Sequence, residues 1–220
     1  QQRQGGVRGL MLGILAGLKQ EARLIRRFLP NAPVALSNAT PEGARRGVER
    51  LLKAGATELL SFGCAGSLSP DVAPGTVIVA DHVRYQDRDI SCDPHLSEMF
   101  GSAYARRGGI LHSDVLVELG LEKAWYFSQT KCLAVDMESG VVADAGVPFA
   151  VLRVVCDDAT RDLPPAVKTS VRDGAVYVPG LLGSLLRHPL QIGGLIRLGR
   201  EAAIAQRSMA SFLQANPPQA

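Results

Sequence analysis

Acidic residues capable of proton transfer follow three apolar segments of the chain. Glu21 comes after "ILAGLKQ", Glu138 after "LAVDM" and Asp157 after "RVVC". An acid at the start of a helix is commonly no more than a partner of the helix dipole. In open α/β sheets, however, ligands bind beyond the carboxyl ends of the strands, so we expect the three acids at one shared edge.

Such a set of groups suits cleavage of the bond between a sugar and a base. That reaction needs an acid that protonates the leaving group, a group that holds the sugar hydroxyls, and a nucleophile placed against a cation-like sugar. Arg153, four residues before Asp157, adds a positive charge. The small residues of "FGCAGSL" (62–68) let the backbone approach a ligand and present N–H groups, although such a segment is more often only a turn.

Apolar stretches with strand character alternate with amphipathic stretches of helical period. The predicted strands lie within residues 7–17, 32–37, 57–66, 75–86, 133–135 and 148–159. The predicted helices lie within residues 19–29, 44–55, 95–107, 115–125 and 138–146. This alternation predicts an α/β fold, a three-layer α-β-α single domain with a central mixed β-sheet. The sheet is expected to be mixed because no helix directly follows the strand at 75–86.

No repeat and no low-complexity linker divides the 220 residues. We expect residues 7–178 to form the α/β domain, residues 179–213 an apolar helical extension of the same domain, and residues 214–220 a tail. Residues 1–6, "QQRQGG", are typical of a disordered or expression-derived start and lack the apolar region of a signal peptide.

Composition excludes several classes of function. The net charge of +3 is small and scattered, which argues against nucleic-acid binding. The 4 cysteines form no CxxC pair and no Cys/His cluster with zinc-ligand spacing, so we expect reduced thiols, a cytoplasmic protein and no bound metal or other cofactor. No apolar run approaches the ~20 residues that a membrane-spanning helix needs.

Four motifs, in this order and spacing, resemble those of the nucleoside phosphorylase/nucleosidase superfamily. They are "GLKQE", "FGCAGSL", "VDMES" and "RVVCDDA", and the resemblance covers roughly residues 8–160. The chain looks similar to the methylthioadenosine/S-adenosylhomocysteine nucleosidases. It resembles the hopanoid-associated phosphorylases more closely, on weaker signals: the Ser-Gly after Met-Glu and the apolar C-terminal extension. The resemblance implies a nucleoside phosphorylase-like fold and release of adenine from a nucleoside.

The resemblance also implies roles for individual residues. Glu138 would accept hydrogen bonds from the ribose hydroxyls, with Met137 packing beside the sugar. Asp157 would be the general acid at the purine N7, and burial should raise its pKa so that it stays protonated. Asp158 takes that role if the register is shifted by one residue. Glu21 would orient and deprotonate the attacking water.

Further contacts follow from the same resemblance. Arg153 would lie beside Glu21. The backbone of Cys64, Ala65 and Gly66 would supply N–H donors near the nucleophile. By a looser alignment, Leu116 and Val117 would meet the adenine edge.

The chain departs from the family pattern at three positions. Cys64 and Cys156 stand where the nucleosidases usually have serines, which weakens polar contacts there. Both thiols are expected to line one pocket, and a disulfide between them is disfavoured in a reducing compartment. Asn38 replaces a glycine in a turn, which Asn can accommodate because it tolerates the left-handed region.

The choice between water and phosphate as nucleophile rests on two positions. The phosphorylases of the superfamily bind phosphate with two arginines, and this chain has Glu21 and Ser61 there. A carboxylate repels phosphate but can act as a base for water, so hydrolysis is favoured. Lys19 and Arg23 could still reach in from the same loop, which keeps phosphorolysis, with phosphate as co-substrate, as the alternative.

The apolar C-terminal segment allows two interpretations. Amphipathic helices usually cover a core, which is the simpler one. Alternatively, the segment forms an apolar patch with arginines that touches a membrane surface or admits a lipid tail, as adenosylhopane, the leading substrate, would require. The nucleosidase branch further implies a homodimer. A catalytically silent module that binds a nucleoside is a third hypothesis, and a serine or cysteine hydrolase lacks its G-x-S-x-G turn.

Overall fold

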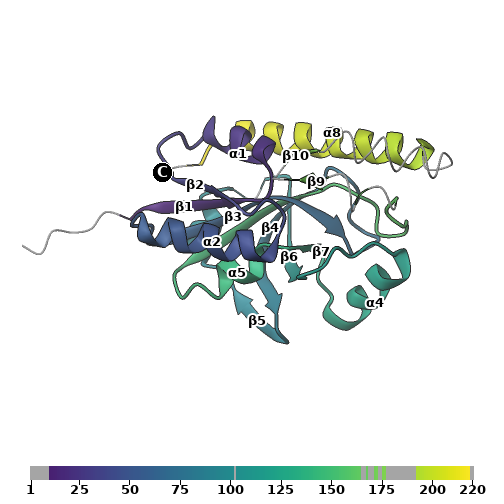
Figure 1. Cartoon of the computed structure of the whole chain (residues 1–220), viewed down its shortest axis with the longest axis horizontal. Coiled ribbons are helices and arrows are strands. Elements are labelled where there is room, and N and C mark those ends of the chain that lie inside the picture. Colours follow the sequence, from purple (N-terminus) through teal and green to yellow (C-terminus); the bar gives the residue numbers. More distant parts are fainter. Residues whose placement is uncertain are drawn as a thin grey trace, which may run out of the picture.

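A mixed eight-stranded sheet forms the centre of the computed structural model (Figure 1). The structure describes residues 10–101, 103–164, 167, 171–172, 175–176 and 192–218. The strands of the sheet are β1 (Leu12–Ala16), β2 (Val34–Leu36), β3 (Glu58–Ser67), β4 (Val77–Tyr85), β5 (Arg88–Ser91), β6 (Ala105–His112), β7 (Ala134–Asp136) and β8 (Phe149–Val155). A separate antiparallel pair consists of β9 (Val171–Arg172) and β10 (Ala175–Val176).

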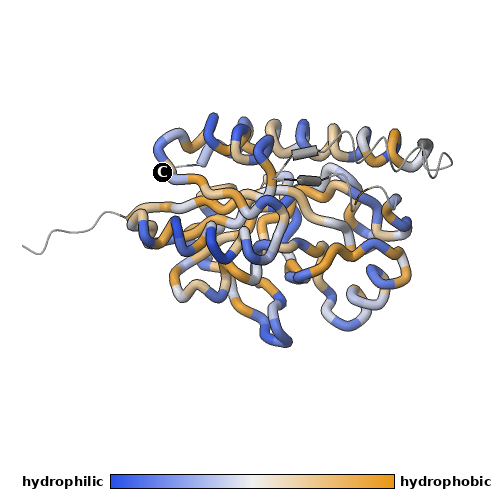
Figure 2. Tube along the Cα trace, in the orientation of Figure 1, coloured by the Kyte–Doolittle hydropathy of each residue, from blue (hydrophilic) through white to orange (hydrophobic). Residues whose placement is uncertain are grey.

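Helices cover both faces of the sheet, so the architecture has three layers (Figure 1). They are α1 (Lys19–Arg26), α2 (Pro41–Lys53), α3 (Pro94–Glu98), α4 (Gly120–Thr130), α5 (Ser139–Ala143) and α8 (Ile192–Ala215). One buried cluster joins the sheet to α2 and α5, and another joins it to α1, α3 and α8. Figure 2 shows the resulting pattern, with hydrophobic strands inside and hydrophilic residues along the outer helices. The predicted α-β-α domain with a mixed sheet is confirmed.

The strands around β3 close into a ring. The sheet order is β2-β1-β3-β7-β6-β4-β5, and β8 pairs with both β3 and β4. β3 runs parallel to β1 and β8 and antiparallel to β7, with which only its last two residues pair. The carboxyl end of β3 therefore lies beside the first residues of β7 and the last residues of β8, the two strands that Glu138 and Asp157 follow.

Local chemistry explains the first two helices. Thr40 caps α2, because its hydroxyl accepts the Gly43 N–H at 3.0 Å and Pro41 follows at the first helical position. The preceding turn places Asn38 at a φ of 57°, the left-handed conformation expected for it. In α1, Glu21 is the third helical residue and its carboxylate accepts the Leu18 N–H at 2.8 Å. That contact holds the Glu21 side chain at the helix start.

Three sequence predictions differ from the structure. The helix expected within 95–107 ends at Glu98, and residues 105–107 begin β6, because Gly101 adopts a φ of 74° and breaks the helix. The helix expected at 115–125 begins only at Gly120. The predicted turn in "FGCAGSL" is instead the end of β3, and β5 was not predicted.

The C-terminal segment is described from residue 192 onward. α8 packs on the sheet through Ala205, Met209, Phe212 and Leu213, which supports the simpler interpretation of a core-covering helix for this part. Ile196 remains 53% exposed. Residues 1–6 and 179–191, for which a disordered start and an apolar extension were predicted, lie outside the described residues. No helix among the described residues is long and apolar enough to span a bilayer.

Candidate active site

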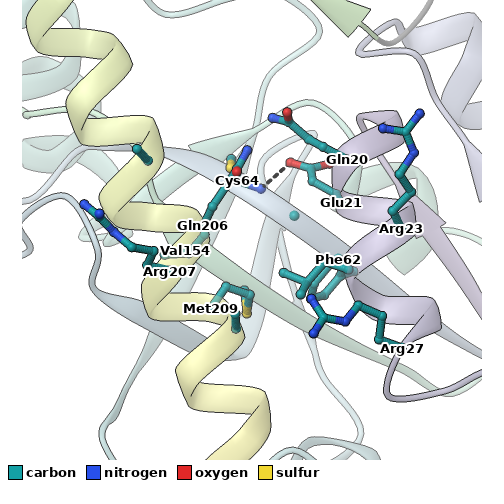
Figure 3. Close-up of a pocket in the computed structure, with 14 residues that line it drawn as sticks. Gln20, Glu21, Arg23, Arg27, Phe62, Cys64, Val154, Gln206, Arg207 and Met209 are labelled. Carbon is teal, nitrogen blue, oxygen red and sulfur yellow. Dashed lines mark hydrogen bonds between the residues drawn. The ribbon is translucent and has the colours of Figure 1, made fainter.

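Glu21 lies over the carboxyl-terminal half of β3. It is buried, and its second carboxylate oxygen accepts the Cys64 N–H at 2.8 Å, the bond dashed in Figure 3. With the Leu18 N–H on the other oxygen, both oxygens are fixed by backbone donors. The carboxylate keeps its remaining lone pairs for a water molecule.

Two glycines make room for this carboxylate. A Cβ at Gly63 would lie 2.6 Å from Glu21 Oε2, and Gly63 has a φ of 148°. A Cβ at Gly17 would lie 3.1 Å from Glu21 Oε2 and 3.2 Å from Glu138 Oε1. Glu21 and Glu138 therefore flank the same point, although they are far apart in the sequence. The strand end at Glu138 and the helix start at Glu21 meet as predicted.

Glu138 is held by a hydroxyl on one side and a guanidinium on the other. Ser37 donates its hydroxyl to Glu138 Oε1 at 2.8 Å, and Arg153 Nη2 donates to Oε2 at 3.3 Å. Arg153 Nη2 also donates to Ser61 Oγ at 2.6 Å, and its Nε lies 2.7 Å from Asp136 Oδ2 as an ion pair outside hydrogen-bond geometry. The arginine expected beside Glu21 thus bonds to Glu138 and pairs with Asp136.

Burial raises the pKa of Glu138 to about 7, and the nearby Arg153 opposes that rise. Asp136 and Glu21 raise it further because their negative charges repel the ionised form. Glu138 therefore changes its charge near neutral pH, while Arg153 supplies the neighbouring positive charge.

Asp157 lies near the end of β3, on the other side of the small residues. Its Oδ1 accepts the Ser67 N–H at 2.7 Å, and its Oδ2 accepts from Lys123 Nζ at 2.7 Å. Burial raises the pKa of Asp157 even though Lys123 acts in the opposite direction, which is the predicted direction and cause. Asp158 is partly exposed, bonds to Thr160 and has a lowered pKa through that bond, so Asp157 is the better candidate acid.

The two halves of the site are separated along β3. Glu21 lies against Gly63, and a Cβ on Gly66 would lie 3.5 Å from both Asp157 oxygens. Three residues of strand span about 10 Å, a distance that suits a nucleoside between sugar and base. The two acids line different cavities, however, of about 460 Å³ for Glu21 and about 50 Å³ for Asp157. The shared edge that we expected for the acids therefore opens into two separate cavities in this structure.

The larger cavity is a groove between α1 and α8, which we call the α1–α8 groove (Figure 3). The apolar side chains that line it are Leu24, Phe62, Val154, Ala203, Met209 and Ala210. The polar ones are Gln20, Glu21, Arg23, Arg27, Cys64, Gln206 and Arg207. The arginines stand on the helices that border it. The groove therefore joins an apolar floor to the candidate base Glu21.

The remaining predicted residues differ in their burial and in their strand pairing. Met137 is partly buried. Ala65 and Gly66 belong to β3, where they lie opposite Val155 of β8 and Val135 of β7, and not to the turn that we expected. The Cys64 N–H is the one that bonds to Glu21. Val117 is buried in a cluster that includes Val135, next to Gly66, whereas Leu116 is 39% exposed.

Cys64 and Cys156 are both free thiols in this structure. The Cys156 thiol donates to Ala65 O at 3.4 Å, and Cys64 lines the α1–α8 groove. The hydrogen bond to Cys156 and burial raise the pKa of Cys64 well above its ordinary value. Cys64 is therefore a neutral thiol, unsuited to act as a nucleophile.

Sequence reasoning missed several residues that hold the acids. Lys123, Ser67, Ser37 and Asp136 bond to them or to Arg153. Ser37 and Ser67 stand at the ends of apolar runs, which is a weak signal. No sequence signal marks Lys123, because a lysine in an amphipathic helix is usually exposed. Among the described residues, no group of three or more His, Cys, Asp or Glu side chains is arranged for a metal ion.

Comparison with known proteins agrees with this architecture. Residues 40–107 match the model of a family described as the Phosphorylase superfamily. A 5'-methylthioadenosine/S-adenosyl homocysteine nucleosidase of Helicobacter pylori has 19% identity and a TM-score of 0.63, covering 94% of this chain and 98% of its own. An S-adenosylhomocysteine nucleosidase of Streptococcus pyogenes has 21% identity and a TM-score of 0.62, covering 96% and 100%.

A futalosine hydrolase of Helicobacter pylori is similar as well, with 18% identity, a TM-score of 0.63 and coverage of 94% and 98%. At these identities the solved structures establish a shared fold.

Proposed function

We propose that the protein is a nucleosidase that cleaves the N-glycosidic bond of an adenine nucleoside with water and releases adenine. The observation that carries this proposal is the arrangement of three buried acids along β3. Glu21 and Glu138 flank Gly17 at one end, and Asp157 lies against Gly66 at the other. The family match over residues 40–107 and the nucleosidase fold support the same reaction.

Each acid has a distinct part in this reaction. Asp157 protonates N7 of the adenine, so that the electron pair of the glycosidic bond leaves with a neutral base. Glu138 accepts hydrogen bonds from the ribose hydroxyls, and Met137 packs beside the sugar. Glu21 takes a proton from the water that attacks the sugar carbon.

The charges favour water over phosphate as nucleophile. Arg153 is fully buried and already engaged by Asp136, Glu138 and Ser61, so it has no free face for a phosphate. Glu21 would repel a phosphate at the same place. Arg23 and Arg27 border the groove next to Glu21 and are the groups that a phosphorolytic reaction would use.

The α1–α8 groove supports a substrate with an apolar 5′ substituent, of which adenosylhopane is our leading candidate. Leu24, Phe62 and Met209 line the groove together with Glu21. Its volume of about 460 Å³ lies within the range of small-molecule sites, roughly 300–1,000 Å³. Methylthioadenosine and S-adenosylhomocysteine are the competing substrates.

A panel of 5′-substituted adenosines, assayed with and without phosphate, tests both parts of the proposal. Free adenine, measured by chromatography, should appear without phosphate and fastest with a bulky apolar substituent. Adenine release that required phosphate would replace hydrolysis by phosphorolysis. Faster release from S-adenosylhomocysteine than from any apolar substrate would remove adenosylhopane as the leading candidate.

Asp157→Asn tests the general acid. We expect kcat to fall about 10²- to 10⁴-fold, because the amide cannot protonate N7, while nucleoside affinity changes little. Asp158→Asn is the matched control, since it alters the neighbouring carboxylate, which bonds to Thr160. Equal turnover by Asp157→Asn and the parent protein would contradict the assignment.

A further inference from the structure

Lys123 is the one fully buried lysine of the described chain, with 0% of its side chain exposed. Of the 11 residues of α4, it is the only buried one. Its ammonium donates to Asp157 Oδ2 at 2.7 Å, to Asp158 O at 3.0 Å and to Arg161 O at 3.2 Å. An ammonium has three protons, and all three have an acceptor here.

The energetic cost of this burial points to the acid. A buried ammonium is costly unless its protons are bonded, and the three acceptors of Lys123 are a carboxyl oxygen of Asp157 and two backbone carbonyls. The two carbonyls belong to the loop that follows Asp157, so the same ammonium holds both the acid and its loop.

We propose that Lys123 is a positioning residue that holds the Asp157 carboxyl toward the base and stabilises the carboxylate formed when Asp157 gives up its proton. The proposal rests on the proposed function. In the step, the Asp157 O–H bond breaks and an N7–H bond forms, while the glycosidic electron pair moves to the base. Water supplies the hydroxyl on the sugar, and its proton goes to Glu21. The new Asp157 carboxylate is then neutralised by the Lys123 ammonium.

Other charged groups also face Asp157. Those around the smaller cavity are Asp158, Arg161, Asp162, Arg197 and Glu201. Arg161 is paired with Asp158 and Glu201, so these charges offset one another. Lys123 is the only cation among the described residues that bonds directly to the Asp157 carboxylate, which is why its removal should dominate the acid strength.

Lys123→Met and Lys123→Gln test the proposal, with exposed Glu122→Gln on the same helix as control. Activity needs protonated Asp157 and so falls as pH rises through the pKa of that group. An opposite charge in contact lowers the pKa of a carboxyl group by about one to three units. Without the ammonium, the pKa of Asp157 and with it the alkaline limb of the kcat–pH profile should therefore move up by about that amount. We expect kcat to fall about 10- to 100-fold with little change in KM, and Lys123→Arg should return the limb toward its parental position.

A loss of activity without movement of the limb would show a merely structural role and overturn the inference. If Lys123→Met does not fold, the profile of Lys123→Gln decides. If the parent protein releases no adenine, the proposed function fails and kinetics decide nothing about Lys123. In that case the carbon NMR titration of the Asp157 carboxyl, in the parent and in Lys123→Gln, settles the inference: an unchanged midpoint overturns it and an upward shift supports the coupling.

Discussion

At the scale of single residues, the site works through fixed carboxylates. Both oxygens of Glu21 accept backbone N–H groups, and those of Glu138 accept Ser37 and Arg153. Fixed donors of this kind need no rearrangement during the reaction. Glu21→Gln keeps the shape of the side chain but loses the base, and its NH₂ group leaves one of the two backbone N–H groups without an acceptor. We expect kcat for adenine release to fall about 10²- to 10⁴-fold; turnover at the parental rate would exclude Glu21 as the base.

Glu138 makes stability depend on pH. Its pKa rises from 4.5 to about 7 on folding, so between these values the folded protein binds a proton that the unfolded chain releases. This contribution is fully present below about pH 4.5 and is lost as pH rises through about 7, by on the order of 3 kcal/mol in total.

Glu138→Gln should remove this dependence. Urea unfolding of parent and variant at about pH 5 and about pH 8 measures the difference in the free energy of unfolding, which should favour the variant more at the higher pH. Glu42→Gln, at an exposed position of α2, is the control. A difference between parent and Glu138→Gln that is constant with pH would contradict the raised pKa.

The residues that sequence reasoning could find are those whose type and place in a pattern agree. Glu21, Glu138 and Asp157 follow apolar strands, and their neighbouring glycines mark close approaches. Lys123 could not be found, because its partner lies 34 residues away and nothing in the local pattern of α4 distinguishes a buried lysine from a solvated one. The division of the cavity also depends on tertiary packing of α8, which no local pattern encodes.

At the scale of elements, β3 connects the core to the chemistry. Its first half packs in the core, and its second half has small residues that admit the acids from α1 and from the loop after β8. Strand patterns predicted β1, β3, β4 and β8 because buried strands are continuous apolar runs. The helix predicted at 95–107 was wrong, since the pattern did not reveal the left-handed turn at Gly101.

Gly63→Ala tests this use of β3. The added methyl would lie 2.6 Å from Glu21 Oε2, and the φ of 148° is strained for alanine. We expect loss of adenine release and a loss of about 1–3 kcal/mol in the free energy of unfolding. Gly199→Ala, at an exposed position in α8 with nothing within 4 Å, should instead stabilise by about 0.5–1 kcal/mol. Parental activity in Gly63→Ala would show that Glu21 needs no such room.

The packing of α8 gives a second prediction for an element. Phe212 is buried against the sheet, and Gln214, two residues later, is exposed. Phe212→Ala should cost about 3–5 kcal/mol in the free energy of unfolding, and Gln214→Ala close to nothing. Chemical denaturation measures both, and a small effect of Phe212→Ala would mean that α8 is only loosely attached.

At the scale of the whole molecule, stability should be uneven. β3 and β8 are paired on both sides within the ring of strands, whereas α4 buries Lys123 alone. Local opening is easiest where few apolar groups are buried. In native-state hydrogen exchange, amides of β3 and β8 should exchange last and those of α4 among the earliest; protection of α4 equal to that of β3 would contradict this.

The two edge strands of the large sheet are both short. β2, with 3 residues, and β5, with 4, are its outermost strands. The unpaired backbone groups of an edge strand can bind a strand of a second chain, and short or charged edge strands make such pairing unfavourable. Residues 88 and 89 of β5 are Arg and Asp. Copies of this chain that associate should therefore do so through helices and loops, leaving the sheets of separate molecules unjoined and the protein resistant to fibril-like growth.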